Sequence, residues 1–306
     1  GITMKILLIP DRPGWAYDIL AQSLRSHSSK HDFDIEYIIN IRRDPESFDV
    51  SNYDLVFFFL WFDGMRYGPS MKGFNFSKSC VGVHSLSWIK RGMTPTQTSD
   101  ICNQFGATGF ISKEIGSILA LENGFFTPNG IDRDLFHPTP LPSTEQLHFM
   151  WVGNPSTSHH GDNKAYHSIV EPVCANLGVS LQTATPDTPV SRDKMGDFYS
   201  KSHVLICTSA HEGGPMPVLE ALASARPVIS TNVGIVPEMV KNGYNGIIIE
   251  RSRSALKEAI ENMIESPNLV ERMHQNLMMD EFSRYTESML KSYYEMFESL
   301  DPNGDE

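Results

Sequence analysis

Short apolar runs alternate with helical patterns along most of the chain, and this alternation limits the fold more than any other feature. Apolar runs that read as strands lie at residues 4–10, 33–39, 54–61, 80–84, 147–153, 203–209, 227–231 and 246–250. Helical spacing lies at residues 15–24, 110–120, 164–178 (with a break expected at Pro172), 254–266 and 281–300. Continuous apolar strands between helices are typical of a parallel sheet covered on both faces. The pattern predicts an α/β protein.

A proline-rich stretch interrupts this alternation. Residues 137–146, "HPTPLPSTEQ", contain three prolines and no apolar periodicity, which is typical of an interdomain linker. A chain of 306 residues fits two domains of ordinary size. We expect Rossmann-like domains at residues 1–140 and 141–280, followed by a last helix at residues 281–306. A ligand is then expected in the cleft between the domains, at the carboxyl ends of the strands.

Charge and apolar content exclude several classes of function. The formal net charge of −12 disfavours nucleic acid and anionic membrane surfaces as partners. The longest apolar run, residues 55–62, is too short to span a bilayer, and the N-terminus lacks the features of a signal peptide. The four cysteines show no CxxC spacing, so we expect buried free thiols and a cytoplasmic protein.

The segment "EGGPMPVLE" at residues 212–220 is the strongest candidate for a binding site. It follows an apolar run and leads into a helix, for which Pro217 suits the first position. The first N–H groups of a helix favour an anion, and Gly213 and Gly214 let a ligand approach the backbone. Glu212 and Glu220 can accept hydrogen bonds from sugar hydroxyls. A nucleotide-sugar fits this pattern, although the spacing alone leaves open a chance pair with a solvated Glu220.

Residues 202–249 resemble the donor-binding half of the family 4 retaining glycosyltransferases of GT-B fold. That family's pattern is E-x7-E, a small-residue helix, "PVI-T", "G--PE" and "-G-NG", and each piece is present here in order. The segments "TPNGIDRDLF" (127–136), "MWVG" (150–153) and "CVGVHS" (80–85) are similar to further parts of the family. The resemblance implies two Rossmann-like domains with parallel sheets facing a central cleft. The N-terminal domain would be the acceptor side, the C-terminal domain would bind the donor, and the last helix would cross back to the N-terminal domain.

The resemblance also implies roles for individual residues. Three of them would be catalytic: Glu212 at the donor sugar, Lys164 at the diphosphate, and His84 approaching the sugar from the first domain. Glu220 would bind the ribose hydroxyls. The other donor-binding positions would be Gly14, Gly153, Asn154, Gly213, Gly214, Met216 and Pro217.

The sequence departs from the family pattern in two places. Asn154 stands where the family usually has arginine, and the segment from there to Lys164 is longer than usual. If Lys164 is the only strong cation, stabilisation of the diphosphate would be weaker; otherwise His159, His160 or a first-domain arginine such as Arg12 would supplement it. The first loop, residues 11–15, lacks the double glycine common in relatives, which bears on the acceptor side.

The resemblance implies a transferase that moves a sugar from a nucleotide-diphosphate sugar to a hydroxyl acceptor. Retention of configuration would follow a front-face mechanism without a metal or other cofactor. Glu212 and Glu220 lie on one side of the sugar in this scheme, so they would not form a glycosidase pair. Two alternatives stay open: a GT-B nucleotide-sugar epimerase or hydrolase, and a nucleotide-sugar-binding protein without catalysis. The base, the sugar and the acceptor are not readable from the sequence.

Overall fold

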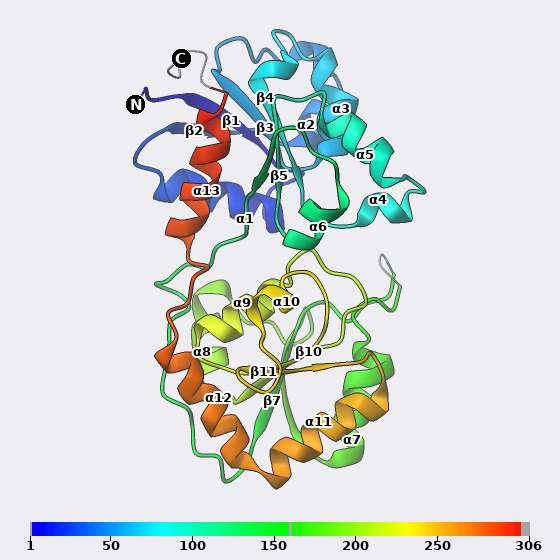
Figure 1. The fold of residues 1–306 in the computed structure, drawn as a ribbon, viewed down its shortest axis with the longest axis vertical. Helices are drawn as coiled ribbons and strands as arrows, with labels where there is room; N and C mark the ends of the chain where they lie inside the picture. The colour runs from blue at the N-terminus through cyan, green and yellow to red at the C-terminus, as the bar shows by residue number, and fades with distance from the viewer. Residues whose placement is uncertain (1, 159–160, 301–306) are drawn as a thin grey trace. The chain divides into compact units, whose positions relative to one another are not determined.

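The computed structural model describes residues 2–158 and 161–300, which form two α/β units (Figure 1). The N-terminal unit combines the first 130 residues with the C-terminal segment that begins at Thr286. The C-terminal unit runs from Ile131 to Tyr285. Each unit has its own sheet and its own hydrophobic core.

The N-terminal unit is built on a six-stranded sheet in the order β2-β1-β3-β4-β5-β6, with every neighbouring pair parallel. Its strands are β1 (Lys5–Ile9), β2 (Asp32–Ile35), β3 (Leu55–Phe58), β4 (Ser79–Val83), β5 (Ala107–Phe110) and β6 (Gly124–Phe126). Its α-helices are α1 (Ala16–His27), α2 (Ile38–Ile41), α3 (Trp61–Tyr67), α4 (Ser87–Lys90), α5 (Pro95–Cys102), α6 (Lys113–Ile118) and α13 (Thr286–Glu298). Short 3-10 turns lie at Pro45–Ser47, Gly68–Ser70 and Phe76–Lys78.

Helices cover both faces of this sheet, so its central strands are apolar along their whole length. On one face Leu7, Val56 and Phe58 pack with Trp61 of α3. On the other face the core includes residues of α1 and of the C-terminal helix α13. The rings of Tyr293 and Phe297 on α13 lie 5.6 and 5.7 Å from that of Phe57.

The C-terminal unit contains a five-stranded parallel sheet in the order β11-β10-β9-β7-β8. Its strands are β7 (His148–Val152), β8 (Ser180–Ala184), β9 (Val204–Cys207), β10 (Val228–Thr231) and β11 (Gly246–Ile249). Its α-helices are α7 (Glu171–Leu177), α8 (Met195–Ser200), α9 (Met216–Ala223), α10 (Val236–Met239), α11 (Arg253–Glu265) and α12 (Pro267–Met279). A π-helix at Tyr166–Val170 precedes α7, and a 3-10 turn at Arg192–Lys194 precedes α8.

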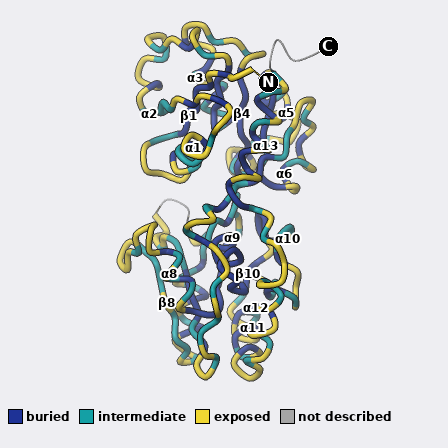
Figure 2. The backbone as a smooth tube through the Cα atoms, turned by 90° about the vertical axis from the view of Figure 1, so that its left-hand side faces the viewer, coloured by how far each residue is buried: buried dark blue, intermediate teal, exposed yellow. Residues whose placement is uncertain are grey.

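Two core clusters cover the faces of the second sheet. One includes residues of α8 and α9, and the other includes residues of α7, α11 and α12. Figure 2 shows the result along the backbone: in both units the buried positions follow the strands, and the exposed positions lie on outer helices and loops. The carboxyl ends of the strands carry the loops in which the candidate site residues were predicted.

The predicted α/β architecture with parallel sheets is confirmed, and the differences concern individual elements. Residues 33–39 were predicted as one strand, but β2 ends at Ile35 and α2 begins at Ile38. A short apolar run does not distinguish a strand from a buried helix, and here the Ile38 amide turns to donate to Pro10 O. The patterns also missed β5, β6, β8 and several helices.

The helix break expected at Pro172 is a change from a π-helix to an α-helix just before the proline. The π-helix ends at Val170, and α7 begins at Glu171 with the proline in its first turn, where no N–H is needed.

All four cysteines, Cys80, Cys102, Cys174 and Cys207, are buried and free, as predicted. No helix in the described part of the chain is both long and apolar enough to cross a membrane.

The proline-rich segment at residues 137–146 is part of the C-terminal unit and is bound there by a buried arginine. Arg226 is 0% exposed, and its guanidinium group donates to main-chain carbonyls of three separate segments of the chain. These acceptors are the carbonyl oxygens of Thr139, Pro140, Tyr199, Ser200, Ser202 and Ser224. Burial lowers the pKa of Arg226 to about 10, so the group stays charged at neutral pH. One cation thus joins the segment to the end of α8.

We predict that Arg226→Met lowers the free energy of unfolding by about 3 kcal/mol or more, because it leaves several buried carbonyls without a donor. Urea unfolding of the full chain, followed by circular dichroism, measures this change. Arg272→Met on α12 is the control: Arg272 is exposed, and its loss is expected to change stability by less than about 0.5 kcal/mol. Equal shifts for the two variants would contradict the anchoring role of Arg226.

Candidate functional site

The segment at residues 212–220 forms the loop and helix that follow the central strand β9. All four residues of β9 are buried, and the chain leaves the sheet after Cys207. Pro215 takes an extended backbone (φ −83°, ψ 136°), and α9 begins at Met216. Pro217 was predicted at the first helical position, but it occupies the second, because Pro215 already ends the extended loop. An N–H group at the second helical position has no carbonyl partner within the helix, so a proline, which lacks this N–H, is compatible with the position.

Glu212 is held at the start of this loop by two donors. The Ser209 hydroxyl donates to Glu212 Oε1 at 2.7 Å, and Lys164 Nζ lies 3.2 Å from the same oxygen. The two side chains of the ion pair are 37% (Lys164) and 17% (Glu212) exposed. The structure therefore brings together the two predicted catalytic residues of this unit, with the lysine side chain still accessible to a ligand.

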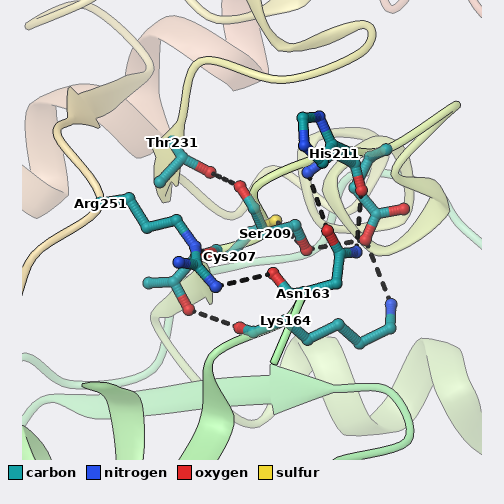
Figure 3. A network of polar contacts seen from close by, with 9 residues as sticks. Asn163, Lys164, Cys207, Ser209, His211, Thr231 and Arg251 are labelled. Carbon is teal, nitrogen blue, oxygen red and sulfur yellow. Dashed lines mark hydrogen bonds and ion pairs between the residues drawn. The ribbon is translucent and has the colours of Figure 1, made fainter. Parts of the chain in front are cut away.

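A brace that the sequence analysis missed fixes the backbone of this loop (Figure 3). The Asn163 side chain accepts from His211 N and donates to His211 O, both at 2.9 Å. Arg251, which follows β11, donates to Thr208 O at 3.0 Å and to Asn163 O at 3.2 Å. The Thr231 hydroxyl donates to Ser209 O at 2.6 Å. The segment that carries Lys164 and the segment that carries Glu212 are thus tied together through main-chain atoms.

Glu220 is buried inside the first turns of α9. Its side chain is 8% exposed, and Tyr199 of α8 donates its hydroxyl to Glu220 Oε1 at 2.9 Å. Burial raises the pKa of Glu220 to about 7, although the Tyr199 hydrogen bond and the charge of Arg192 act in the opposite direction. A carboxyl group held in this state is not a solvated surface residue, and spacing alone did not exclude that alternative. Tyr199 was not identified from the sequence.

Gly153 and Asn154 lie directly after β7. The Gly153 backbone has φ +151°, and a Cβ at this position would lie 3.4 Å from Lys164 Cδ, so the lysine stem passes close to the glycine. Asn154 is exposed, and its Oδ1 accepts from Ser156 N at 3.0 Å. Asn154 therefore forms a local turn and carries no charge that could replace the arginine of related proteins.

Gly234 lets a second loop pack against the candidate site. Its backbone has φ +53°, and a Cβ at this position would lie 1.9 Å from Gly214 O. The same carbonyl accepts from Ile235 N at 2.8 Å. Gly214 is therefore held by a contact that only glycine at position 234 permits. Gly213 is half-buried in the same loop.

His84 and Gly14 belong to the N-terminal unit, at the carboxyl ends of β4 and β1. The His84 ring is 6% exposed and lies 4.8 Å from the ring of Tyr17 and 6.0 Å from that of Phe59. Both ring nitrogens are buried without a hydrogen-bond partner among the described residues. Burial lowers the pKa of His84 to about 3, so the ring is neutral. A buried polar group without a partner is unusual, and Trp88 Nε1 and Tyr293 OH share this feature in the described part of the chain, so it does not by itself assign a function to His84.

Gly14 shapes the loop that follows β1. Its φ of +80° is readily adopted only by glycine, and its amide donates to Asp18 Oδ2 at 2.7 Å. Asp18 is buried and also accepts from the Tyr37 hydroxyl at 2.8 Å. The sequence analysis did not identify Asp18.

The sequence analysis named Arg12, His159 and His160 as further cations that could supplement Lys164. Arg12 lies in the N-terminal unit, where its guanidinium stacks on the Trp15 ring at 4.2 Å. His159 and His160 lie outside the described residues. Within residues 2–158 and 161–300, no group of three or more His, Cys, Asp or Glu side chains could hold a metal ion.

The arrangement in the C-terminal unit favours one kind of ligand. Lys164 and the first N–H groups of α9 favour an anion. Glu212 and Glu220, eight positions apart along one loop and helix, can each accept hydrogen bonds from hydroxyl groups. The unit is therefore suited to an anionic group that has hydroxyl-bearing groups on two sides.

Comparison with known proteins places the sequence likeness in this unit. Residues 188–277 match the family model of the glycosyl transferases group 1. A glycosyltransferase of Methanocaldococcus jannaschii whose activity is uncharacterized is 33% identical over 117 residues. That alignment covers 38% of this chain and only 32% of the relative's own length. These matches support a relation to the group 1 glycosyl transferases in the part of the chain that carries Glu212 and Glu220.

Solved structures match over nearly the whole chain. The sucrose-phosphate synthase of Thermosynechococcus elongatus has a TM-score of 0.71 at 14% identity, covering 97% of this chain and 99% of that one. The Anabaena protein HepE in complex with UDP has a TM-score of 0.71 at 13% identity, covering 97% of this chain and 100% of that one. The predicted GT-B fold, two Rossmann-like units with parallel sheets, is thereby confirmed.

We predict that Gly234→Ala destabilises the chain by about 2 kcal/mol more than Gly243→Ala. Both glycines have positive φ, but a Cβ at position 243 meets nothing within 4 Å, whereas a Cβ at position 234 clashes with Gly214 O. Urea unfolding measures the difference. Hydrogen exchange should also show faster exchange at Ala210 and His211 in Gly234→Ala, because the loop must move away. Equal effects of the two substitutions would contradict this close packing.

Proposed function

We propose that the protein is a retaining glycosyltransferase, similar to those of family 4, that uses a nucleotide-diphosphate sugar as donor. The observation that carries the proposal is the loop and helix from Glu212 to Glu220. It has a hydrogen-bonded carboxylate at each end, and Lys164 pairs with the first of them. The match to group 1 glycosyl transferases and the UDP bound to HepE support the same conclusion.

Glu220 would bind the ribose hydroxyls of the donor. Its Oε1 already accepts from Tyr199, so Oε2 remains for the ligand. Hydrogen bonds donated by hydroxyls favour the ionised carboxylate, so donor binding would lower the pKa of Glu220 from about 7. Tyr199 would act as a positioning residue that fixes the rotamer of Glu220.

Lys164 would move from Glu212 to the diphosphate when the donor binds. The pair is separated by 3.2 Å in the ligand-free protein, and the lysine is accessible enough to change its partner. Negative charge builds on the leaving diphosphate during transfer, and a cation there stabilises the transition state more than the ground state. Glu212, still held by Ser209, would then accept hydrogen bonds from hydroxyls of the sugar.

Transfer with retention would follow a front-face path. The acceptor hydroxyl oxygen forms a bond to the anomeric carbon on the side from which the diphosphate leaves. The bond between that carbon and the phosphate oxygen breaks, and the departing phosphate takes the hydroxyl proton. In this proposal Lys164 and the helix N–H groups supply the positive charge without a metal. His84 and Gly14 of the N-terminal unit would contact the sugar and the phosphates.

The proposal is tested with UDP-, GDP-, ADP- and TDP-sugars, each with a panel of hydroxyl acceptors. We expect a new glycoside whose anomeric configuration equals that of the donor. Glu212→Gln should lower kcat/KM on the order of 100-fold, because it removes a charged hydrogen-bond acceptor at the sugar. The control is Glu258→Gln on α11, an exposed carboxylate whose loss should leave the rate unchanged.

Three outcomes would contradict the proposal. Free sugar released at the same rate with and without acceptor would indicate a hydrolase. A donor converted to its epimer would indicate an epimerase. Nucleotide-sugar binding without turnover across the whole panel would indicate a protein that only binds the ligand.

A further inference from the structure

Glu238 and Arg284 form a buried ion pair in the C-terminal unit. Their side chains are 8% and 12% exposed, and Arg284 Nη2 lies 3.7 Å from Glu238 Oε1. Burial lowers the pKa of Arg284, and the charge of Glu238 acts in the opposite direction. Removing two charges from water costs free energy, and a well-packed apolar pair of similar size would avoid this cost. The buried pair is therefore better explained by the position that it fixes than by the stability that it adds.

Glu238 lies on α10, a helix of four residues that follows the loop with Gly234. A helix this short is not stable by itself, so contacts with the rest of the unit must hold it in place. The amide of Ile235 at its start donates to Gly214 O at 2.8 Å, and the amide of Glu238 donates to Ile235 O at 3.0 Å. The position of α10 therefore decides where Gly214, in the loop that carries Glu212, is held.

Arg284 lies beside the segments through which the chain enters and leaves the C-terminal unit. The chain enters this unit after Gly130 and leaves it after Tyr285. The Ile131 amide donates to Arg284 O at 2.8 Å, and Ile131 pairs with Tyr285 in an isolated parallel bridge. Ile131 and Tyr285 also belong to the same core cluster as Ile235. The ion pair thus connects α10 to both of these segments.

We propose that Glu238 and Arg284 are positioning residues of the donor site, because their ion pair fixes α10 and α10 in turn fixes Gly214 beside the diphosphate. This inference rests on the proposed transferase function. The effect is reciprocal by thermodynamic linkage. A diphosphate that holds the loop at Gly214 therefore also stabilises α10 and the hydrogen bond from Ile131 to Arg284.

The first test measures the affinity of the full-length chain for UDP, GDP, ADP and TDP by calorimetry, and for the corresponding nucleosides by NMR titration. Glu238→Gln and Arg284→Gln should each weaken the best-bound diphosphate about five-fold. The same variants should weaken its nucleoside less than about two-fold, because the ion pair acts through Gly214 on the diphosphate and not on the ribose.

Further variants separate the ion pair from other causes. Arg284→Lys keeps the cation and should retain the affinity for the diphosphate within about two-fold. The double variant Glu238→Gln with Arg284→Gln leaves no unpaired buried charge, so it should show the loss of one single variant and not the product of two. Glu261→Gln is the control, since it removes an ion pair with Lys257 whose side chains are 42% and 52% exposed, and it should leave the affinity unchanged.

Amide hydrogen exchange distinguishes positioning from a general loss of stability. In the wild-type protein we expect a saturating diphosphate to slow exchange at Ile131 and at His211. In Glu238→Gln the protection at His211 should persist, whereas the protection at Ile131 should be lost. The amide of Ser266, which donates to Asn262 O at the end of α11, is the reference outside this path.

The inference is overturned if Glu238→Gln binds the diphosphate as tightly as the wild type, if it weakens diphosphate and nucleoside equally, or if Glu261→Gln has the same effect. Protection at Ile131 that persists in Glu238→Gln would also overturn it. If a single variant does not fold, the double variant decides, and wild-type affinity in that protein contradicts the inference.

Failure of the proposed function has a different signature. In that case the nucleoside diphosphates do not bind the wild-type protein, while Glu238→Gln still speeds exchange of the Ile235 amide without any ligand. Unchanged exchange at Ile235 overturns the positioning role of Glu238 by itself, whether or not a nucleotide binds.

Discussion

The parallel direction of every strand is the constraint on which the candidate sites depend. A parallel strand must be followed by a crossover, so all connections that leave the carboxyl ends gather at one edge of the sheet. In the C-terminal unit this edge collects the segments after β7, β9, β10 and β11, which carry Lys164, Glu212, Gly234 and Arg251. In the N-terminal unit it collects the segments with Gly14 and His84. Residues far apart in sequence thereby become neighbours without any local signal.

Hydrogen bonds to main-chain atoms hold these neighbouring segments in a fixed geometry. Asn163 and Arg251 hold the backbone at His211 and Thr208, just before Glu212, and the Ser209 hydroxyl donates to the Glu212 carboxylate, so Glu212 does not rely on its ion pair with Lys164 for its position. The ion pair is therefore available to exchange for a ligand contact. Glu220 is also held in place without a ligand. It is buried, and the Tyr199 hydroxyl donates to its Oε1, while Oε2 stays available. Both carboxylates are preorganised in the absence of a ligand, which lowers the free energy that binding must spend on ordering them.

Much of the fold was predictable from the sequence because buried strands appear as continuous apolar runs and amphipathic helices carry a local periodicity. Strands with weak periodicity were missed: β8 has the sequence "SLQTA" and is half-exposed, and β6 has only three residues. The position of the candidate-site loop was also predictable, since Glu212, the two glycines and Glu220 lie in one short stretch of sequence. Its supporting residues were not, because Tyr199 binds Glu220 across 21 residues and Arg251 binds Thr208 across 43. Such pairings depend on the three-dimensional order of the strands, and no spacing in the sequence encodes them.

The central claim is that Glu220 binds the ribose of a nucleoside diphosphate, and a double-mutant cycle measures it most directly. The affinity of the best-bound nucleoside diphosphate is compared with that of its 2′,3′-dideoxy analogue, in the wild-type protein and in Glu220→Gln. We propose that the two hydroxyls donate to the Glu220 carboxylate, so their removal should weaken wild-type binding about ten-fold and affect the variant much less, a coupling of about 1 kcal/mol or more. An equal loss in both proteins would show that Glu220 does not contact the ribose and would contradict the account.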